Sequence, residues 1–150
     1  MEQFRFESLL KLRESERDEK KLALVAFQKS LDQASERLAS LEAQIKESLA
    51  QSRSVRTQAT VTAQVLRNRQ ASHNALLQRR KEALRELQLL QEEFHAKCEE
   101  LTEVSKEVKA LTTLKEKEEA RRQEALLKRA NKELDDYSIQ SHTQKRQTEN

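Results

Sequence analysis

Three histidines and one cysteine are the residues of this sequence best suited to metal binding or nucleophilic chemistry. His95 and Cys98 are three residues apart, a spacing that places both on one helix face and would supply two metal ligands. A structural zinc site needs four ligands. Cys98 also falls on an apolar seam, where a thiol packs as a small hydrophobic group. We therefore predict no metal site and no cofactor.

Catalytic motifs are also missing from the sequence. It contains no Gly-rich phosphate loop, no nucleophile elbow and no Cys/His pair with an orienting third group. The slender helical fold expected below also offers no concave pocket that would exclude water from a reaction. We predict that the protein is not an enzyme.

The composition indicates long helices. The chain has 150 residues, of which 37% are charged and 35% hydrophobic, with no Gly and no Pro. Turns and helix stops usually use those two residues, so the backbone is expected to turn very little. The abundant Leu, Ala, Glu, Lys, Arg and Gln are strong helix formers. Disorder is the competing interpretation for so charged a chain, and the periodic apolar residues argue against it.

Charge and hydropathy restrict the compartment and the partners. The net charge is +3, and neither a stacking platform nor a known module for nucleic acid is present, so we predict no nucleic-acid partner. No apolar run approaches the roughly 20 residues of a membrane span, and the N-terminus lacks a signal-peptide pattern. A single Cys fits a reducing compartment. We expect a cytoplasmic protein without direct membrane insertion.

Apolar residues recur at alternating spacings of three and four in both halves of the chain, which is the seam of a coiled coil. Leu76, Ala83, Leu90, Val104 and Leu111 lie beside the second seam. Traced backwards, the first seam passes through three charged layers at Arg13, Arg17 and Lys20 before Leu10 and Phe6. The predicted core residues are Leu31, Leu38, Leu41, Ile45, Val55, Leu66, Leu77, Leu84, Leu87, Phe94, Cys98, Leu101 and Val108.

The seam is interrupted between Leu66 and Leu76, where residues 67–74 read RNRQASHN. Asn, Ser and His favour breaks when Gly and Pro are missing. We predict an all-α fold, an antiparallel two-helix coiled-coil hairpin with a short loop near residues 67–74. The single domain 1–150 would comprise helix one at about 2–68, a loop at about 69–73, helix two at about 74–138 and a disordered tail at about 139–150.

This hairpin implies a definite register, in which the numbers of facing residues add up to about 142 or 143. Leu66 would face Leu77, Ala59 would face Leu84 and Ser48 would face Phe94. Because the loop contains no Gly or Pro, a dimer of two continuous helices remains the alternative, and a monomer is the default.

Two of the four phenylalanines lie in the first six residues. In the predicted hairpin both chain ends meet, so Phe4 and Phe6 would lie near Leu134 and Tyr137. The two phenylalanines would then either clamp the frayed end of the hairpin or bind a partner. The sequence leaves both interpretations open.

The predicted loop end carries charge of one sign. No Asp or Glu occurs from Ser48 through Lys81. Such a patch would steer an acidic partner towards this end; alternatively, Arg is present only as a good helix former. The cations of the stretch are Arg53, Arg56, Arg67, Arg69, Arg79, Arg80 and Lys81.

Motifs at both ends of the chain resemble a known family. The N-terminal pattern F-R-F-x-x-L-L-x-L-R is carried by Phe4, Arg5, Phe6, Leu9, Leu10, Leu12 and Arg13. An L-A-x-x-A stretch follows at 22–26, and E-L-D-D-Y stands at 133–137. Together with the length and the missing Gly and Pro, these motifs resemble the flagellar export protein FliJ family over nearly the whole chain.

The resemblance implies a stalk protein of the flagellar type III export apparatus, peripheral on the cytoplasmic side of the cell membrane. The implied partners are the hexameric flagellar export ATPase, into which the stalk inserts, the export gate protein FlhA and export chaperones. Contacts with the ATPase ring would be made by Phe4, Arg5, Phe6, Leu9, Leu12 and Arg13. The seven cations Arg53, Arg56, Arg67, Arg69, Arg79, Arg80 and Lys81 would face the gate.

Three other functions remain open from the sequence. They are the stalk of a non-flagellar type III secretion system, an export chaperone, and a structural coiled-coil dimerisation segment of a longer protein. The initial Met, the FRF motif directly after it and the polar tail favour a complete small protein over the last of these.

Overall fold

The computed structural model describes residues 3–58 and 60–148 and consists of two long helices. Helix α1 spans Glu7–Arg56 and helix α2 spans Ala63–Thr148. The predicted all-α helical hairpin is confirmed. Residues 1, 2, 59, 149 and 150, which include the predicted start of helix one, the seam position Ala59 and the end of the predicted tail, lie outside the described residues.

The chain divides into two compact units, which we describe separately. One, here called the turn unit, is Arg17–Glu103; the other, the terminal unit, combines Met1–Glu16 with Val104–Asn150. Both helices contribute to both units. The prediction of one coiled-coil domain over 1–150 stays a prediction, whereas the bounds of its helices are corrected below.

The turn lies at residues 57–62, not at 67–74 as predicted. Thr57, Thr60, Val61 and Thr62 are β-branched and therefore poor helix formers. Thr62 caps α2, because its Oγ1 accepts a hydrogen bond from the Val65 backbone N–H at 3.4 Å. The predicted breaker sequence RNRQASHN is helical throughout. A cluster of β-branched residues thus ends the helix in place of Gly or Pro.

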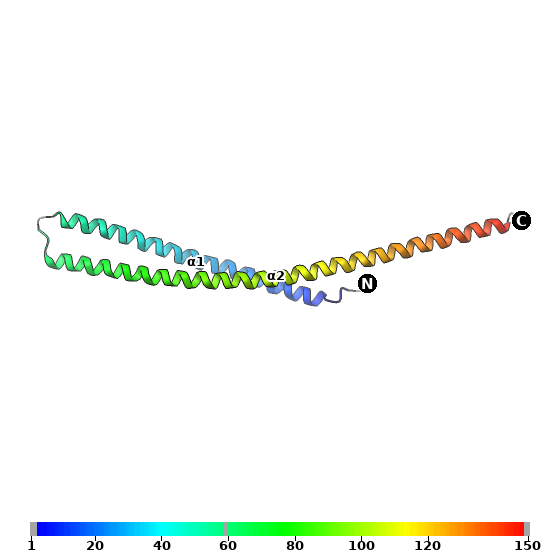
Figure 1. The fold of residues 1–150 in the computed structure, drawn as a ribbon, viewed down its shortest axis with the longest axis horizontal. Coiled ribbons are helices and arrows are strands. Elements are labelled where there is room, and N and C mark those ends of the chain that lie inside the picture. Colours follow the sequence, from blue (N-terminus) through cyan, green and yellow to red (C-terminus); the bar gives the residue numbers. More distant parts are fainter. Residues whose placement is uncertain (1–2, 59, 149–150) are drawn as a thin grey trace. The chain divides into compact units, whose positions relative to one another are not determined.

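The register of the hairpin differs from the prediction accordingly. In the turn unit, α1 and α2 run antiparallel on either side of the turn (Figure 1). Lys20 Nζ lies 3.2 Å from Glu100 Oε2, and Ser48 Oγ lies 3.5 Å from His73 Nδ1. These residue numbers add up to 120 and 121, about 21 less than predicted. The predicted pairs of described residues, including Leu66 with Leu77 and Ser48 with Phe94, are therefore wrong.

The buried positions of α1 are the predicted ones. In α2, every second seam position lies one residue before the predicted one, as with Ala83 in place of Leu84. Leu31, Ala34, Ile45 and Val55 are buried in α1. In α2, Ala83 and Val104 are buried, whereas the predicted core residues Leu66 and Leu77 are 44% and 39% exposed. Half-buried predicted core positions are Leu38, Leu41, Leu84, Leu87, Phe94, Cys98 and Leu101, and Val108 is buried.

An aromatic pair sits inside the turn unit. The rings of Phe27 and Phe94 are stacked, with centroids 6.3 Å apart, and Lys97 Nζ lies 5.6 Å from the Phe27 centroid. Phe94 therefore meets another large ring and not the small Ser48. This layer fills the seam between the apolar layers nearer the turn and the charged residues Arg17 and Lys20.

The C-terminal part of α2 is longer than predicted. The sequence predicted an end near residue 138 and a disordered tail, but α2 continues to Thr148, with Lys145 and Arg146 favourably placed in its last turn. Within the terminal unit, every side chain from Glu119 to Thr148 is exposed apart from the half-buried Ser141. This segment of α2, residues 119–148, is called the extension below.

Candidate protein-interaction surfaces

The terminal unit is built around the first residues of the chain. Leu10 is 4% exposed and packs in one cluster with Val104, Val108 and the partly buried Leu111 of α2. Phe4 is 8% exposed. The described part of this segment, residues 3–16, is called the strap. Its apolar side chains supply the small core of this unit.

Phe4 and Phe6 lead the strap into α1. Their rings meet edge to face with centroids 5.8 Å apart, and the Arg5 guanidinium lies 5.5 Å from the Phe6 centroid. The Glu7 N–H donates a hydrogen bond to the Phe4 carbonyl at 3.0 Å, which starts the helix. The clamping role of Phe4 agrees with the structure, although its neighbours differ from those expected.

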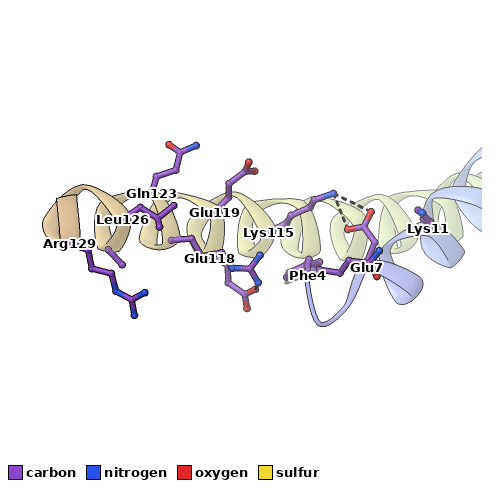
Figure 2. Close-up of a pocket in the computed structure, with 12 residues that line it drawn as sticks. Phe4, Glu7, Lys11, Lys115, Glu118, Glu119, Gln123, Leu126 and Arg129 are labelled. Carbon is purple, nitrogen blue, oxygen red and sulfur yellow. Dashed lines mark hydrogen bonds and ion pairs between the residues drawn. The ribbon is translucent and has the colours of Figure 1, made fainter. Parts of the chain in front are cut away.

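The residues that line the groove beside Phe4 come from the strap and from α2 between Lys115 and Arg129. In Figure 2, Phe4 and Glu7 lie beside Lys115, whereas Leu126 and Arg129 lie farther along α2. Leu134 and Tyr137 are 67% and 72% exposed. The predicted proximity of Phe4 and Phe6 to these two residues is therefore wrong, because the register brings Lys115 to the strap.

Two ion pairs tie the strap to α2. Lys115 Nζ lies 2.9 Å from Glu7 Oε2, and Arg13 Nε lies 2.9 Å from Glu107 Oε2. The Lys115 pKa is raised above its ordinary value, first by the hydrogen bond to Glu7 and then by the charges of Glu7, Glu119 and Glu14, against the opposing effect of burial. A lysine whose pKa is raised on folding stabilises the folded state at pH values below its ordinary pKa. This contribution is therefore present at neutral pH and is lost only in strong alkali.

Arg13 shows the same behaviour. Its pKa is raised by a hydrogen bond to Glu16 and by the charge of Glu107, and the Arg13 Nη1 to Glu16 Oε2 distance is 2.7 Å. The charged layer predicted at Arg13 is thus an ion-paired layer that joins the two helices. The Arg13 guanidinium is thus engaged by two carboxylates of the terminal unit, those of Glu16 and Glu107.

The extension carries a second apolar stripe. The contact series of α2, Val108, Leu111 and Lys115, continues at the same spacing through Glu118, Arg122, Ala125 and Arg129. Leu127, Ala130, Leu134 and Tyr137 form another series, offset by two residues and therefore about 200° around the helix. The stripe thus lies on the side of α2 away from the strap. Large apolar side chains of the extension that are 63% to 72% exposed are Leu126, Leu127, Leu134, Tyr137 and Ile139.

The structure separates the predicted ring-contact residues into two groups. Phe4 is buried and Phe6 is half-buried, whereas Leu9 and Leu12 are 40% and 63% exposed. Arg5 is exposed. The sequence prediction missed the extension because it expected Leu134 and Tyr137 to be covered by the strap. The three-four spacing of its apolar residues is the signal that could have identified it.

The turn unit brings together four of the seven predicted gate-contact residues. Arg53 and Arg56 lie in the last turn of α1, and Arg67 and Arg69 lie near the start of α2. Arg69 Nη1 donates to Gln51 Oε1 at 3.5 Å. The other three, Arg79, Arg80 and Lys81, lie farther down α2, and Arg80 Nε is 3.9 Å from Glu42 Oε1. The two groups are therefore separate along the helix.

Neither a metal centre nor a membrane span is found in the described part of the chain. Among residues 3–58 and 60–148, no three or more His, Cys, Asp or Glu side chains are grouped as metal ligands. His95 lies 3.3 Å from Glu99 on the same helix, with both side chains mostly exposed. Over the same residues, neither helix contains a stretch apolar enough to cross a bilayer.

Comparison with known proteins supports the resemblance noted in the sequence. The family model described as flagellar FliJ protein matches residues 1–147. No curated protein and no solved structure matches the chain. The matched region includes the strap, both helices and nearly all of the extension, so the chain belongs to the flagellar FliJ family, which has a role in flagellar protein export.

Proposed function

We propose that this chain is a non-enzymatic stalk that inserts its terminal unit into the hexameric flagellar export ATPase and links that ATPase to the export gate protein FlhA. Export chaperones are further proposed partners. The observation that carries the proposal is the extension, a helical segment with a stripe of large apolar side chains that nothing in its own unit covers.

The energetics favour a protein partner on this stripe. Burying a Leu side chain is worth about 1.5–3 kcal/mol, and the stripe contains Leu127, Leu134 and Tyr137. The groove-side series is charged instead, at Glu118 directly before the extension and at Arg122 and Arg129 within it. A single helix with both kinds of face suits the lumen of a ring, which surrounds it with apolar and polar loops.

The strap has two proposed roles in that contact. Exposed Arg5, Leu9 and Leu12 would touch the ring directly. Phe4, Phe6 and Arg13, whose side chains pack or pair within the terminal unit, would act by holding the strap on α2. The seven cations of the turn unit would face the gate, with Arg53, Arg56, Arg67 and Arg69 nearest the turn.

The proposal is tested with the full chain and the purified export ATPase. Leu127→Ser, Leu134→Ser and Tyr137→Ser together remove the stripe. We expect at least a tenfold loss of affinity for the ATPase and loss of ATPase stimulation, because Leu127, Leu134 and Tyr137 are 64%, 67% and 72% exposed and their burial on binding would be lost. Affinity is measured by titration calorimetry and stimulation by phosphate release.

The matched control removes three equally exposed apolar side chains of the turn unit, Leu22→Ser, Val25→Ser and Leu89→Ser, which are 73%, 70% and 57% exposed. This variant should bind and stimulate as the parent does. If the control lost stimulation and the stripe variant kept it, the insertion of the terminal unit would be wrong. If only the replacement of Arg67, Arg69, Arg79 and Arg80 by Ala abolished ATPase stimulation, the turn unit and not the terminal unit would enter the ATPase.

A further inference from the structure

The end of the turn unit combines cations with exposed apolar side chains. Arg53 and Arg56 end α1, and Arg67 and Arg69 follow the start of α2. All four lie within about 9 Å of a helix end at 1.5 Å per residue. Val65 and Leu66, in the first turn of α2, are 42% and 44% exposed. These six residues are called the tip.

No carboxylate neutralises the tip. The segment from Ser48 to Lys81 contains no Asp or Glu. The polar contacts of the tip are with neutral groups: Arg69 donates to the Gln51 side chain at 3.5 Å, and Arg67 Nε donates to the Ala63 carbonyl at 3.4 Å. In the described part of the chain, none of the four arginines is in an ion pair with a carboxylate. Their charge is therefore available to an external anion.

Arg79, Arg80 and Lys81 are not part of this surface. Arg79 lies 16 residues after Ala63, or about 24 Å along α2, which exceeds the Debye length of about 8–10 Å at physiological ionic strength. Arg80 is also 3.9 Å from Glu42. An end-on contact at the turn would engage the four tip arginines and leave these three in solvent.

We propose that the tip binds the surface of an anionic phospholipid bilayer end-on. A bilayer presents negative headgroups in a plane directly above an apolar layer. Cations from both helices can reach that plane at once, while Val65 and Leu66 enter the boundary. No aromatic residue occurs between Phe27 and Phe94, so the base stacking that single-stranded nucleic acid requires is missing. The four arginines are those proposed above to face the gate, so the bilayer would be a second anionic surface for the same end of the turn unit. The vesicle test contains neither the ATPase nor the gate and therefore separates the two proposals.

The test is vesicle flotation with the full chain. The vesicles contain phosphatidylcholine alone or with about one third phosphatidylglycerol, in low and high salt. We expect binding only to the anionic vesicles, weakened by salt. Arg53→Gln, Arg56→Gln and Arg67→Gln together should lower the partition coefficient by about a hundredfold, at about fivefold for each cation. Val65→Ser with Leu66→Ser should weaken binding at both salt concentrations.

The matched control removes three exposed lysines away from the tip, Lys29→Gln, Lys109→Gln and Lys132→Gln. It changes the net charge equally and should bind as the parent does. Equal loss in this control would mean non-specific attraction and would overturn the proposal. So would failure of the parent chain to float with anionic vesicles in low salt. Efficient displacement by poly-glutamate, with no effect of the Val65 and Leu66 changes, would assign the tip to an acidic protein instead.

Discussion

At the scale of single residues, the strap shows how few side chains hold the terminal unit together. Leu10 is the most buried residue of α1 at 4% exposure, level with Val108 of α2. The other attachments are Phe4 and the ion pairs of Glu7 and Arg13. Ion pairs at the surface contribute little to stability. Leu10 and Phe4 must therefore supply most of the energy that keeps the strap on α2.

This argument predicts the effect of one substitution. Leu10→Ala should destabilise the strap by about 2–4 kcal/mol, through lost burial and a cavity beside Val104 and Val108. Amide hydrogen exchange should become much faster in residues 7–16 and stay unchanged around the turn. Leu12→Ala is the matched control, because Leu12 is 63% exposed. Equal acceleration in both variants would show that the burial of Leu10 is not what holds the strap, because Ala is a better helix former than Leu and neither change lowers helix propensity.

At the scale of the helices, the turn decides which residues meet. The predicted and observed registers differ by about 21 in the sum of facing residue numbers, which is three heptads. A displacement by whole heptads again opposes one seam to the other, so the apolar pattern fits both arrangements. The β-branched residues Thr57, Thr60, Val61 and Thr62 distinguish them, because α1 ends at Arg56, about twelve residues before the predicted end near residue 68.

The register is tested by cysteine cross-linking in a Cys98→Ser background. Ser48→Cys with His73→Cys should form an intramolecular disulfide rapidly under mild oxidation, because these side chains are 3.5 Å apart. Ser48→Cys with Phe94→Cys, the pair of the alternative register, should remain reduced. Mass spectrometry after alkylation counts the free thiols. A disulfide in the second pair alone would support the predicted turn at residues 67–74 and contradict the observed register.

At the scale of the whole molecule, the hairpin covers its own seam without a second chain. Phe27 of the turn unit stacks on Phe94 of α2, and Leu31, Ile45 and Val55 are buried within the same unit. The alternative of two continuous helices would need residues 57–62 to be helical, and Thr62 instead caps α2. The extension also exposes large apolar side chains, which we propose bind the ATPase.

We therefore expect a monomer of 17.5 kDa in solution, measured by light scattering coupled to gel filtration over a range of concentrations. A mass of twice this value at every concentration would favour the dimer of continuous helices. A dimer that appears only at high concentration and disappears with Leu127→Ser, Leu134→Ser and Tyr137→Ser would identify the stripe as the self-associating surface.

The amino-acid sequence alone was enough to predict two long helices, the seam of α1 from Leu31 to Val55, the three charged layers and the family. These features depend on local propensity and on spacing within one helix, which the residues specify directly. The position of the turn and the exposure of the extension depend on which heptads of the two helices face each other. Apolar periodicity repeats every seven residues and leaves that choice open, so only the packed tertiary structure decided that Phe4 is buried and the stripe at Leu127, Leu134 and Tyr137 is exposed.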